Sequence, residues 1–247
     1  YSKYTTYQTL FYDRTNPSRI FAVIDTLDLF QKGLSPVMLE VLSKKKVKET
    51  VSQFHLAFRR LQKKPRANFN TGSPESHLLS LYGRLSSRDW KAIEQNMRSQ
   101  PGQRDRVLQG ISNADPFFPA MEFIFKKFAL PVELTRIPLV ESSFNLNAVS
   151  KARAKGTWQF MEASAREFLV VDPIHKIDER VSPIKSAYAA AKMLLRHFKI
   201  LGDWGLAIIS YNHGLKTLIP IAKKYKGENI AKLLTLQKTS PLGYDSK

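Results

Sequence analysis

One glutamate, Glu141, lies where the sequence could turn a carboxyl group into a proton donor. It directly follows the apolar run at 137–140, IPLV. Apolar neighbours exclude water from a carboxylate, which raises its pKa and lets the acid keep its proton near neutral pH. The same residues would also fit an exposed glutamate at the end of a helix. The residues after Glu141 must therefore decide between a general acid and a surface side chain.

Neutral hydrogen-bonding groups and aromatic rings alternate after Glu141. The polar members are Ser142, Ser143, Asn145, Asn147, Ser150, Thr157 and Gln159, and the rings are Phe144, Trp158 and Phe160. Aromatic rings pack against the apolar faces of sugars, and amides and hydroxyls bond sugar substituents without burying a charge. Trp158 and Phe160 would equally fit a hydrophobic core. The pattern indicates a carbohydrate cleft beside the acid.

Four motifs in this region resemble, in order and spacing, the signatures of the family 1 lytic transglycosylases. They are Glu141-Ser142-Ser143-Phe144-Asn145, Ala148-x-Ser150, Gly156-Thr157-Trp158-Gln159-Phe160-Met161 and Tyr211-Asn212-His213-Gly214. The similarity extends over roughly residues 102–225. It implies an all-α fold, with a goose-lysozyme-like helical catalytic domain and an additional N-terminal helical region.

The resemblance also implies a reaction, namely cleavage of the bond between N-acetylmuramic acid and N-acetylglucosamine in peptidoglycan glycan strands. Glu141 would first protonate the glycosidic oxygen and then, as carboxylate, take a proton from the muramoyl primary hydroxyl. The product would carry a 1,6-anhydromuramoyl end and no water would be consumed. The matching positions assign seven further residues to substrate binding: Ser142, Ser150, Gly156, Gln159, Phe160, Tyr211 and Asn212. Tyr211 could instead bury its ring in the core.

Two alternatives to this reaction share the same fold. A hydrolytic muramidase needs a second carboxylate, and the sequence has none between Glu141 and Glu162. The acids of Asp178-Glu179-Arg180 fit a salt-bridged structural corner. A catalytically weak peptidoglycan-binding or scaffold protein is the other alternative. It arises because Arg153 and Lys155 replace the glycine and the small residue that are usual in the family.

Composition limits the partners and the compartment. The net charge of +18 predicts attraction to polyanions, including nucleic acid, anionic lipid and acidic wall polymer. The basic runs at 44–48 and 63–66 lack the interleaved aromatics of a single-strand groove, so we interpret them as solvated helix faces and expect no nucleic-acid partner. Peripheral contact with a membrane or with wall polymers fits the same charge. The resemblance implies a periplasmic or otherwise wall-facing bacterial protein, and residue 1 opens without a signal-sequence pattern.

Metal chemistry and cofactors find no support in the residues. The five histidines are scattered and form no HExxH or comparable ligand set, and no phosphate-cradling glycine loop occurs. Cysteine is absent. We therefore expect an enzyme that works with neither a metal nor a cofactor.

The elements that must position these residues are predicted to be helices almost throughout, because apolar residues recur at helical spacing. We expect helices at 16–33, 35–61 and 73–85, loops at 63–72 and around 99–102, a core helix at 182–202 and a short helix starting at Asp203. Residues 1–114 would form the N-terminal helical region, and 115–247 the catalytic domain.

Overall fold

The computed structural model describes residues 3–224, which fall into two compact units. Unit 1 is Tyr1–Leu108 and unit 2 is Gln109–Lys247. The end of the predicted catalytic domain, from residue 225 on, lies outside the described residues. Within residues 3–224, no helix combines the length and apolar character that crossing a membrane requires.

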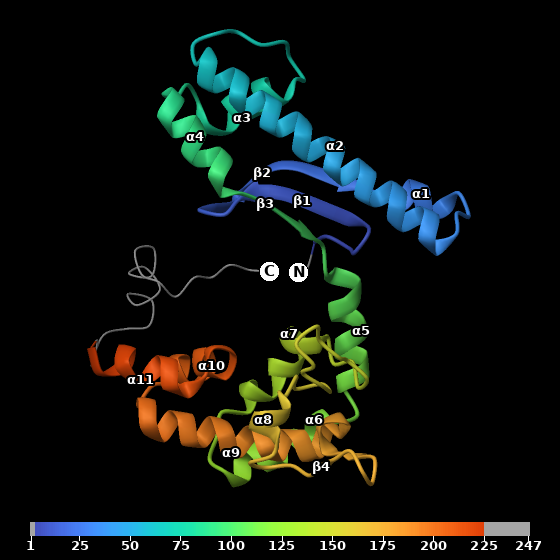
Figure 1. Cartoon of the computed structure of the whole chain (residues 1–247), viewed down its shortest axis with the longest axis vertical. Helices are drawn as coiled ribbons and strands as arrows, with labels where there is room; N and C mark the ends of the chain where they lie inside the picture. The colour runs from blue at the N-terminus through green and yellow to red at the C-terminus, as the bar shows by residue number, and fades with distance from the viewer. Residues whose placement is uncertain (1–2, 225–247) are drawn as a thin grey trace. The chain divides into compact units, whose positions relative to one another are not determined.

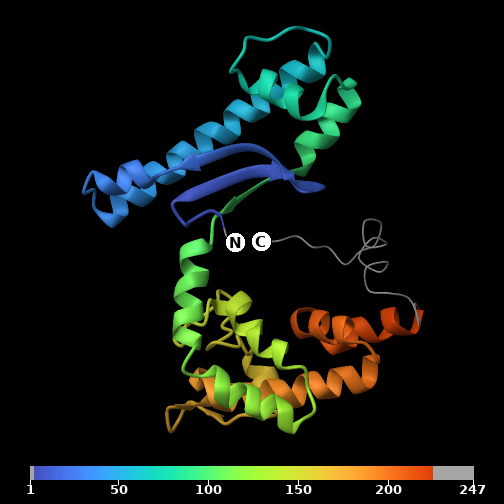
Figure 2. The ribbon, with the colours of Figure 1, turned by 180° about the vertical axis from the view of Figure 1, so that it is seen from behind.

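Unit 1 is built on a three-stranded antiparallel sheet in the order β2-β1-β3 (Figures 1 and 2). The strands are β1 (Gln8–Asp13), β2 (Asn16–Asp25) and β3 (Met97–Pro101). Four helices accompany it: α1 (Leu27–Gln31), α2 (Pro36–Lys63), α3 (Pro74–Tyr82) and α4 (Ser87–Asn96). The core lies where Phe11 and Phe21 of the sheet meet Phe54, Phe58 and Leu61 of α2.

The prediction of a helix at 16–33 is wrong, because residues 16–25 form β2. The strand pairs Phe11 with Ala22 and Tyr12 with Ile20, so Phe21 is an extra residue at a β-bulge. Because of the bulge, the side chains of Phe21 and Ile24 both point into the core of unit 1, although they are three residues apart. A spacing of three between buried residues is typical of a helix, whereas in a regular strand buried and exposed side chains alternate. The N-terminal region is therefore not purely helical.

The prediction of a loop around 99–102 is also wrong. Residues 97–101, MRSQP, form edge strand β3, which pairs with β1 from Thr9–Pro101 to Asp13–Met97. No residue of this strand is buried, so it carries no apolar alternation to reveal it. Only the backbone hydrogen bonds of the sheet define this strand.

Within residues 109–224, most of the regular structure of unit 2 is helical, which confirms the predicted fold class (Figure 1). Its larger helices are α5 (Arg104–Ala114), which begins in the last residues of unit 1, α6 (Phe118–Lys127), α9 (Pro183–Leu201), α10 (Trp204–His213) and α11 (Leu215–Lys224). The short elements are η1 (Val132–Arg136), α7 (Ile137–Ser142), α8 (Glu162–Ala165), β4 (Val171–Asp172), β5 (Ile177–Asp178) and η2 (Glu179–Val181).

The predicted helix starts at Ser35, Ser73, Ser182 and Asp203 are confirmed. Each of these side chains accepts a hydrogen bond from the backbone N–H three residues further on, which satisfies a donor that the first helical turn leaves unpaired. The core helix α9 also ends as predicted, at Gly202 in a left-handed conformation.

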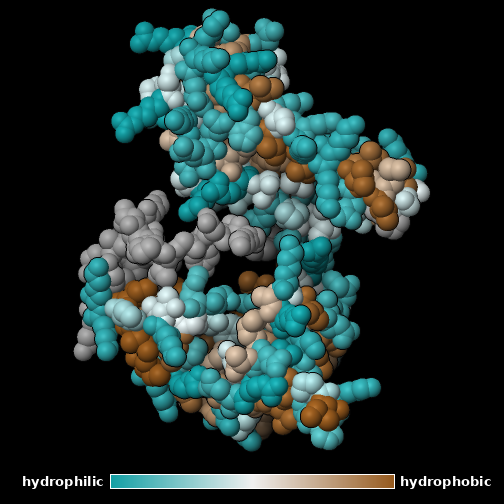
Figure 3. Space-filling model, viewed as in Figure 1, coloured by the Kyte–Doolittle hydropathy of each residue, from teal (hydrophilic) through white to brown (hydrophobic). Residues whose placement is uncertain are grey.

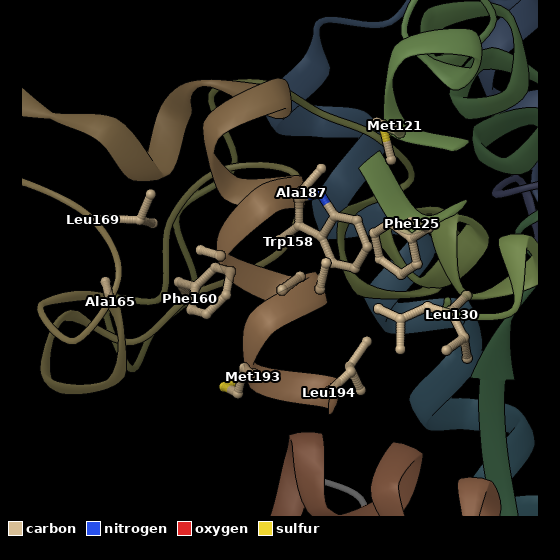
Figure 4. Close-up of a cluster of buried hydrophobic side chains, with 14 of the residues drawn as sticks. Met121, Phe125, Leu130, Trp158, Phe160, Ala165, Leu169, Ala187, Met193 and Leu194 are labelled. Atoms are coloured by element: carbon tan, nitrogen blue, oxygen red, sulfur yellow. The ribbon is translucent and has the colours of Figure 1, made fainter. Parts of the chain in front are cut away.

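The core of unit 2 surrounds α9, as Figure 4 shows. Trp158 is fully buried and stacks on Phe125 with ring centroids 5.8 Å apart. Ala187 and Leu194 of α9 and Leu130 belong to the same cluster. Because Trp158 comes from the segment between α7 and α8, the core fixes this segment directly beside the candidate acid.

Candidate active site

Glu141 lies on α7, one residue before the end of the helix, and its side chain is partly buried. Burial raises the pKa of its carboxyl above the ordinary value of 4.5, because the charged form loses hydration. A hydrogen bond with the Asn212 side chain opposes this shift by favouring the carboxylate. The site therefore holds a carboxyl group that favours its protonated form more than an exposed glutamate would.

Two contacts fix the chain reversal just after Glu141. Ser143 and Phe144 both have left-handed backbone conformations, with φ of +49° and +51°. The Phe144 ring is fully buried and packs against Phe117 and Phe118. On α5, a Cβ atom at Gly110 would lie 2.6 Å from the Ser143 carbonyl oxygen, so only glycine allows this close approach. The end of α7 is thus held from two sides.

Helix α10 brings Tyr211 and Asn212 close to Glu141. The Tyr211 hydroxyl donates a 2.6 Å hydrogen bond to the Trp158 carbonyl oxygen, and its ring meets Phe160 edge-on at 6.0 Å. Burial and the nearby Glu141 charge raise the pKa of Tyr211 well above 10, so this phenol stays protonated. The side chains of Trp158 and Phe160 are buried in the core, so their contacts with Tyr211 fix its position.

The remaining predicted site residues tie the segment 142–160 together. The Ser142 hydroxyl donates to the Thr157 carbonyl oxygen at 2.8 Å. The Gln159 amide donates to the Gly156 carbonyl oxygen at 2.8 Å, and the Ser150 hydroxyl accepts from the Ala154 backbone N–H at 3.0 Å. Ser142 therefore fastens the helix of the acid to this segment, whereas Ser150 and Gln159 bond within it.

Arg180 is a structural support that the motifs did not reveal. Its buried guanidinium binds Asp178 through two hydrogen bonds of 2.8 Å and reaches the carbonyl oxygens of Arg153 and Phe160, each at 3.4 Å. Asp178 also binds Lys155 at 3.0 Å, and the Arg180 guanidinium beside it holds the pKa of Asp178 well below its usual range. The interpretation of 178–180 as a salt-bridged corner is confirmed. Its additional role is to hold the segment 153–160 in place.

The other carboxylates of unit 2 are largely engaged elsewhere. Glu122 pairs with Arg136, Glu162 with Arg166, Glu167 with Arg196, Asp172 with His175 and Glu179 with Lys185, and Asp203 caps α10. Glu141 differs from these paired acids, because burial raises the pKa of its carboxyl above the ordinary value. No group of three or more potential metal ligands occurs in residues 3–224. The chemistry that this arrangement supports is proton transfer by one acid.

Arg153 occupies the left-handed conformation that its usual glycine would favour, with φ of +65° and an exposed side chain. An L-residue in this conformation costs about 1–2 kcal/mol, partly offset because glycine is more flexible when unfolded. We expect Arg153→Gly to raise the free energy of unfolding by about 1 kcal/mol, measured by urea denaturation.

The matched control for Arg153→Gly is Lys151→Gly, two residues away. Lys151 is also exposed, but its backbone is not left-handed. Glycine there should lower the stability by roughly 0.5–1 kcal/mol, since it only adds flexibility to the unfolded chain. A loss of stability in both variants would contradict the strain assigned to Arg153.

Comparison with known proteins agrees with the geometry. The family model described as "Transglycosylase SLT domain" matches residues 125–234. The chain is 34% identical over 102 residues to the membrane-bound lytic murein transglycosylases D of Escherichia coli strains K12 and O6:H1, covering 41% of this chain and 22% of each relative. It is 36% identical over 105 residues to a putative tributyltin chloride resistance protein of Alteromonas sp. strain M-1, covering 42% of this chain and 50% of that protein.

The matched region thus spans about a fifth of the two E. coli relatives and half of the Alteromonas protein. The region 125–234 that the family model matches includes α7, the segment 142–160 and α10, which together carry Glu141, Tyr211 and Asn212. The resemblance of the motifs to the lytic transglycosylases is confirmed, and membrane-bound lytic murein transglycosylase D is among the matching relatives. Residues 125–234 therefore match the transglycosylase SLT domain, and the mainly helical structure of unit 2 agrees with this match.

Proposed function

We propose that unit 2 is a peptidoglycan lytic transglycosylase that cleaves the bond between N-acetylmuramic acid and N-acetylglucosamine without water. The single observation that carries this proposal is the environment of Glu141. Its carboxyl has a raised pKa, shares a hydrogen bond with the Asn212 side chain and lies near enough to Tyr211 to raise the pKa of that phenol, within the region that the family model matches. A wall-facing location, periplasmic or equivalent, follows from this substrate and belongs to the same proposal.

Glu141 acts first as an acid and then as a base. The protonated carboxyl gives its proton to the glycosidic oxygen as the bond to the muramoyl C1 breaks. The carboxylate left behind is stabilised by the hydrogen bond with Asn212. It then takes the proton of the muramoyl primary hydroxyl while that oxygen bonds to C1. The proton returns to Glu141, and the product is a 1,6-anhydromuramoyl end.

The other assigned residues divide into two roles in this proposal. Tyr211 and Asn212 hold the carboxyl and border the sugar, and Ser150 and Gln159 offer the polar atoms that their bonds within the segment leave unused. Ser142, Gly156 and Phe160 act as positioning residues, because they contact the backbone or the core around the acid. The residues that border the bound sugar would thus be held in place before the sugar binds.

A hydrolytic muramidase is less well supported than a lytic transglycosylase. Hydrolysis needs a second carboxylate to act as nucleophile or to activate water. The acids of 178–179 are bound to Arg180, Lys155 and Lys185, which suits support of the fold. The scaffold alternative rests on Arg153 and Lys155. The Lys155 charge, however, is paired with Asp178.

Mass spectrometry of the products tests the proposal. The purified chain is incubated with peptidoglycan sacculi and the soluble muropeptides are analysed. We expect anhydro ends, which are one water lighter than the reducing ends that a hydrolase leaves. Uniformly reducing ends would establish hydrolysis. Sedimentation of the protein with sacculi and no soluble product would establish the scaffold alternative.

A further inference from the structure

The N-terminal end of α2 extends beyond the core of unit 1. From Val37 on, the first buried residue of this helix is Phe54, although the helix begins at Pro36. The short helix α1 beside it has no buried residue. The buried residues of the helix lie in its second half, and Val47 packs partly buried against the core of unit 1. The turns before Val47 and helix α1 project beyond these contacts. We call residues 27–48 the tip of unit 1.

The tip exposes large apolar side chains. They are Leu27 (41% exposed), Phe30 (52%), Val37 (72%), Met38 (49%) and Val41 (55%). Figure 3 shows apolar side chains gathered at the end of unit 1 that carries α1. Isolated exposed apolar residues are ordinary on a protein surface, but a contiguous group marks an interaction site.

Lysines lie next to these apolar side chains in the sequence, at Lys32 and at four of the positions 44–48. The tip holds five lysines against two acids, Asp28 and Glu40. On the exposed face of α2, Val37, Val41, Lys44 and Lys48 follow one another at intervals of four, three and four residues, so they share one side of the helix. Apolar residues therefore occupy the first turns of this face, and lysines occupy the next turns.

The order of these residues along α2 matches the layers of a membrane surface. Val41 and Lys48 are seven residues apart, or about 10 Å along the helix. A helix tip that enters the boundary between headgroups and acyl chains inserts its apolar residues by roughly 5–10 Å. The lysines then lie level with anionic headgroups, and their long side chains can reach these groups.

We propose that the tip of unit 1 binds the surface of an anionic lipid bilayer, with Phe30, Val37 and Val41 inserted and Lys44, Lys45 and Lys48 on the headgroups. Nucleic acid would use the lysines but would leave the apolar residues exposed to water. The combination of both features favours the bilayer. This surface belongs to unit 1 and is independent of the reaction proposed for unit 2.

Cosedimentation with vesicles tests the proposal on the whole chain. Wild-type protein should bind vesicles of phosphatidylcholine with phosphatidylglycerol and should bind pure phosphatidylcholine far more weakly. The double variant Val37→Ser, Val41→Ser should bind the anionic vesicles at least about tenfold more weakly, since two valines lose their burial in the bilayer. The control is Leu56→Ser on the same helix, where Leu56 is 51% exposed but lies outside the tip. It should bind as the wild type does.

A fluorescent label provides a second readout, because the chain contains no cysteine. An environment-sensitive dye on Val37→Cys should shift to the blue when anionic vesicles are added, and the same dye on Leu56→Cys should not. Unchanged binding by the double serine variant together with no shift at position 37 would overturn the proposal, leaving attraction by charge alone. Self-association of the wild type without vesicles, lost in the serine variant, would overturn it in favour of a second copy of the chain.

Discussion

Glu141→Gln is expected to lower the release of anhydro-muropeptides from sacculi by about a thousandfold, within the roughly 10²–10⁴-fold that a general acid contributes. Glutamine has nearly the same size as glutamate and keeps an oxygen that can accept a hydrogen bond from Asn212. It has no acidic proton to give to the glycosidic oxygen. It also cannot become the carboxylate that takes the proton of the primary hydroxyl. One substitution therefore removes both halves of the proposed mechanism.

The matched control is Glu133→Gln. Glu133 is an exposed acid in η1, eight residues before Glu141. Its substitution removes the same negative charge from unit 2 and should leave the rate of muropeptide release unchanged. A Glu141→Gln protein that keeps more than about a tenth of the wild-type rate would exclude Glu141 as the general acid.

The same variant makes a prediction about stability that separates catalysis from folding. The unfolded chain releases the Glu141 proton near pH 4.5, whereas the folded chain keeps it to a higher pH because burial raises the pKa. Within this window the folded state binds more protons, so the free energy of unfolding falls as the pH rises. Glutamine does not titrate and escapes this loss. Urea denaturation should therefore find Glu141→Gln more stable than the wild type at pH 7, with the difference vanishing below about pH 4.

The sequence predicted those parts of the fold that have a local cause. A serine before a proline can cap a helix by itself, so the starts of α2, α3 and α9 followed from the residues alone. Strand β2 was mistaken for a helix because its bulge at Phe21 depends on pairing with β1. Strand β3 exists only through its pairing with a strand more than eighty residues away in the sequence.

The candidate site shows the same division. The motifs pointed to Glu141, Tyr211 and Asn212 because a carboxylic acid, a phenol and an amide are groups that can transfer protons or form hydrogen bonds with a sugar. The residues around Arg180 in the sequence do not predict that its guanidinium reaches the carbonyl oxygens of Arg153 and Phe160. That contact depends on the fold of two segments that are at least twenty residues apart in the sequence. The sequence therefore allowed the ion pair between Asp178 and Arg180 to be predicted, but not the hydrogen bonds by which Arg180 holds the segment 153–160.

Gly156→Ala tests this support, and we expect it to lower the free energy of unfolding by about 3–4 kcal/mol, from a strained backbone and an overpacked site together. A Cβ atom at position 156 would lie 1.9 Å from the Arg180 carbonyl oxygen and 2.8 Å from the carbonyl carbon. These are backbone atoms, so a side-chain rotation cannot relieve the clash. The positive φ of +76° adds strain for any L-residue.

The matched control is Gly202→Ala at the end of α9, also in unit 2. Gly202 has nearly the same φ, +74°, but a Cβ atom there would have no neighbour within 4 Å. Its substitution should cost only the conformational strain, about 1–2 kcal/mol. Urea denaturation of the two variants therefore isolates the contact with Arg180, and equal losses would show that this contact does not hold the segment. Because the Gly156 carbonyl oxygen also accepts the Gln159 amide hydrogen bond, a shift at 156 should reduce muropeptide release as well, whereas Gly202→Ala should leave it intact.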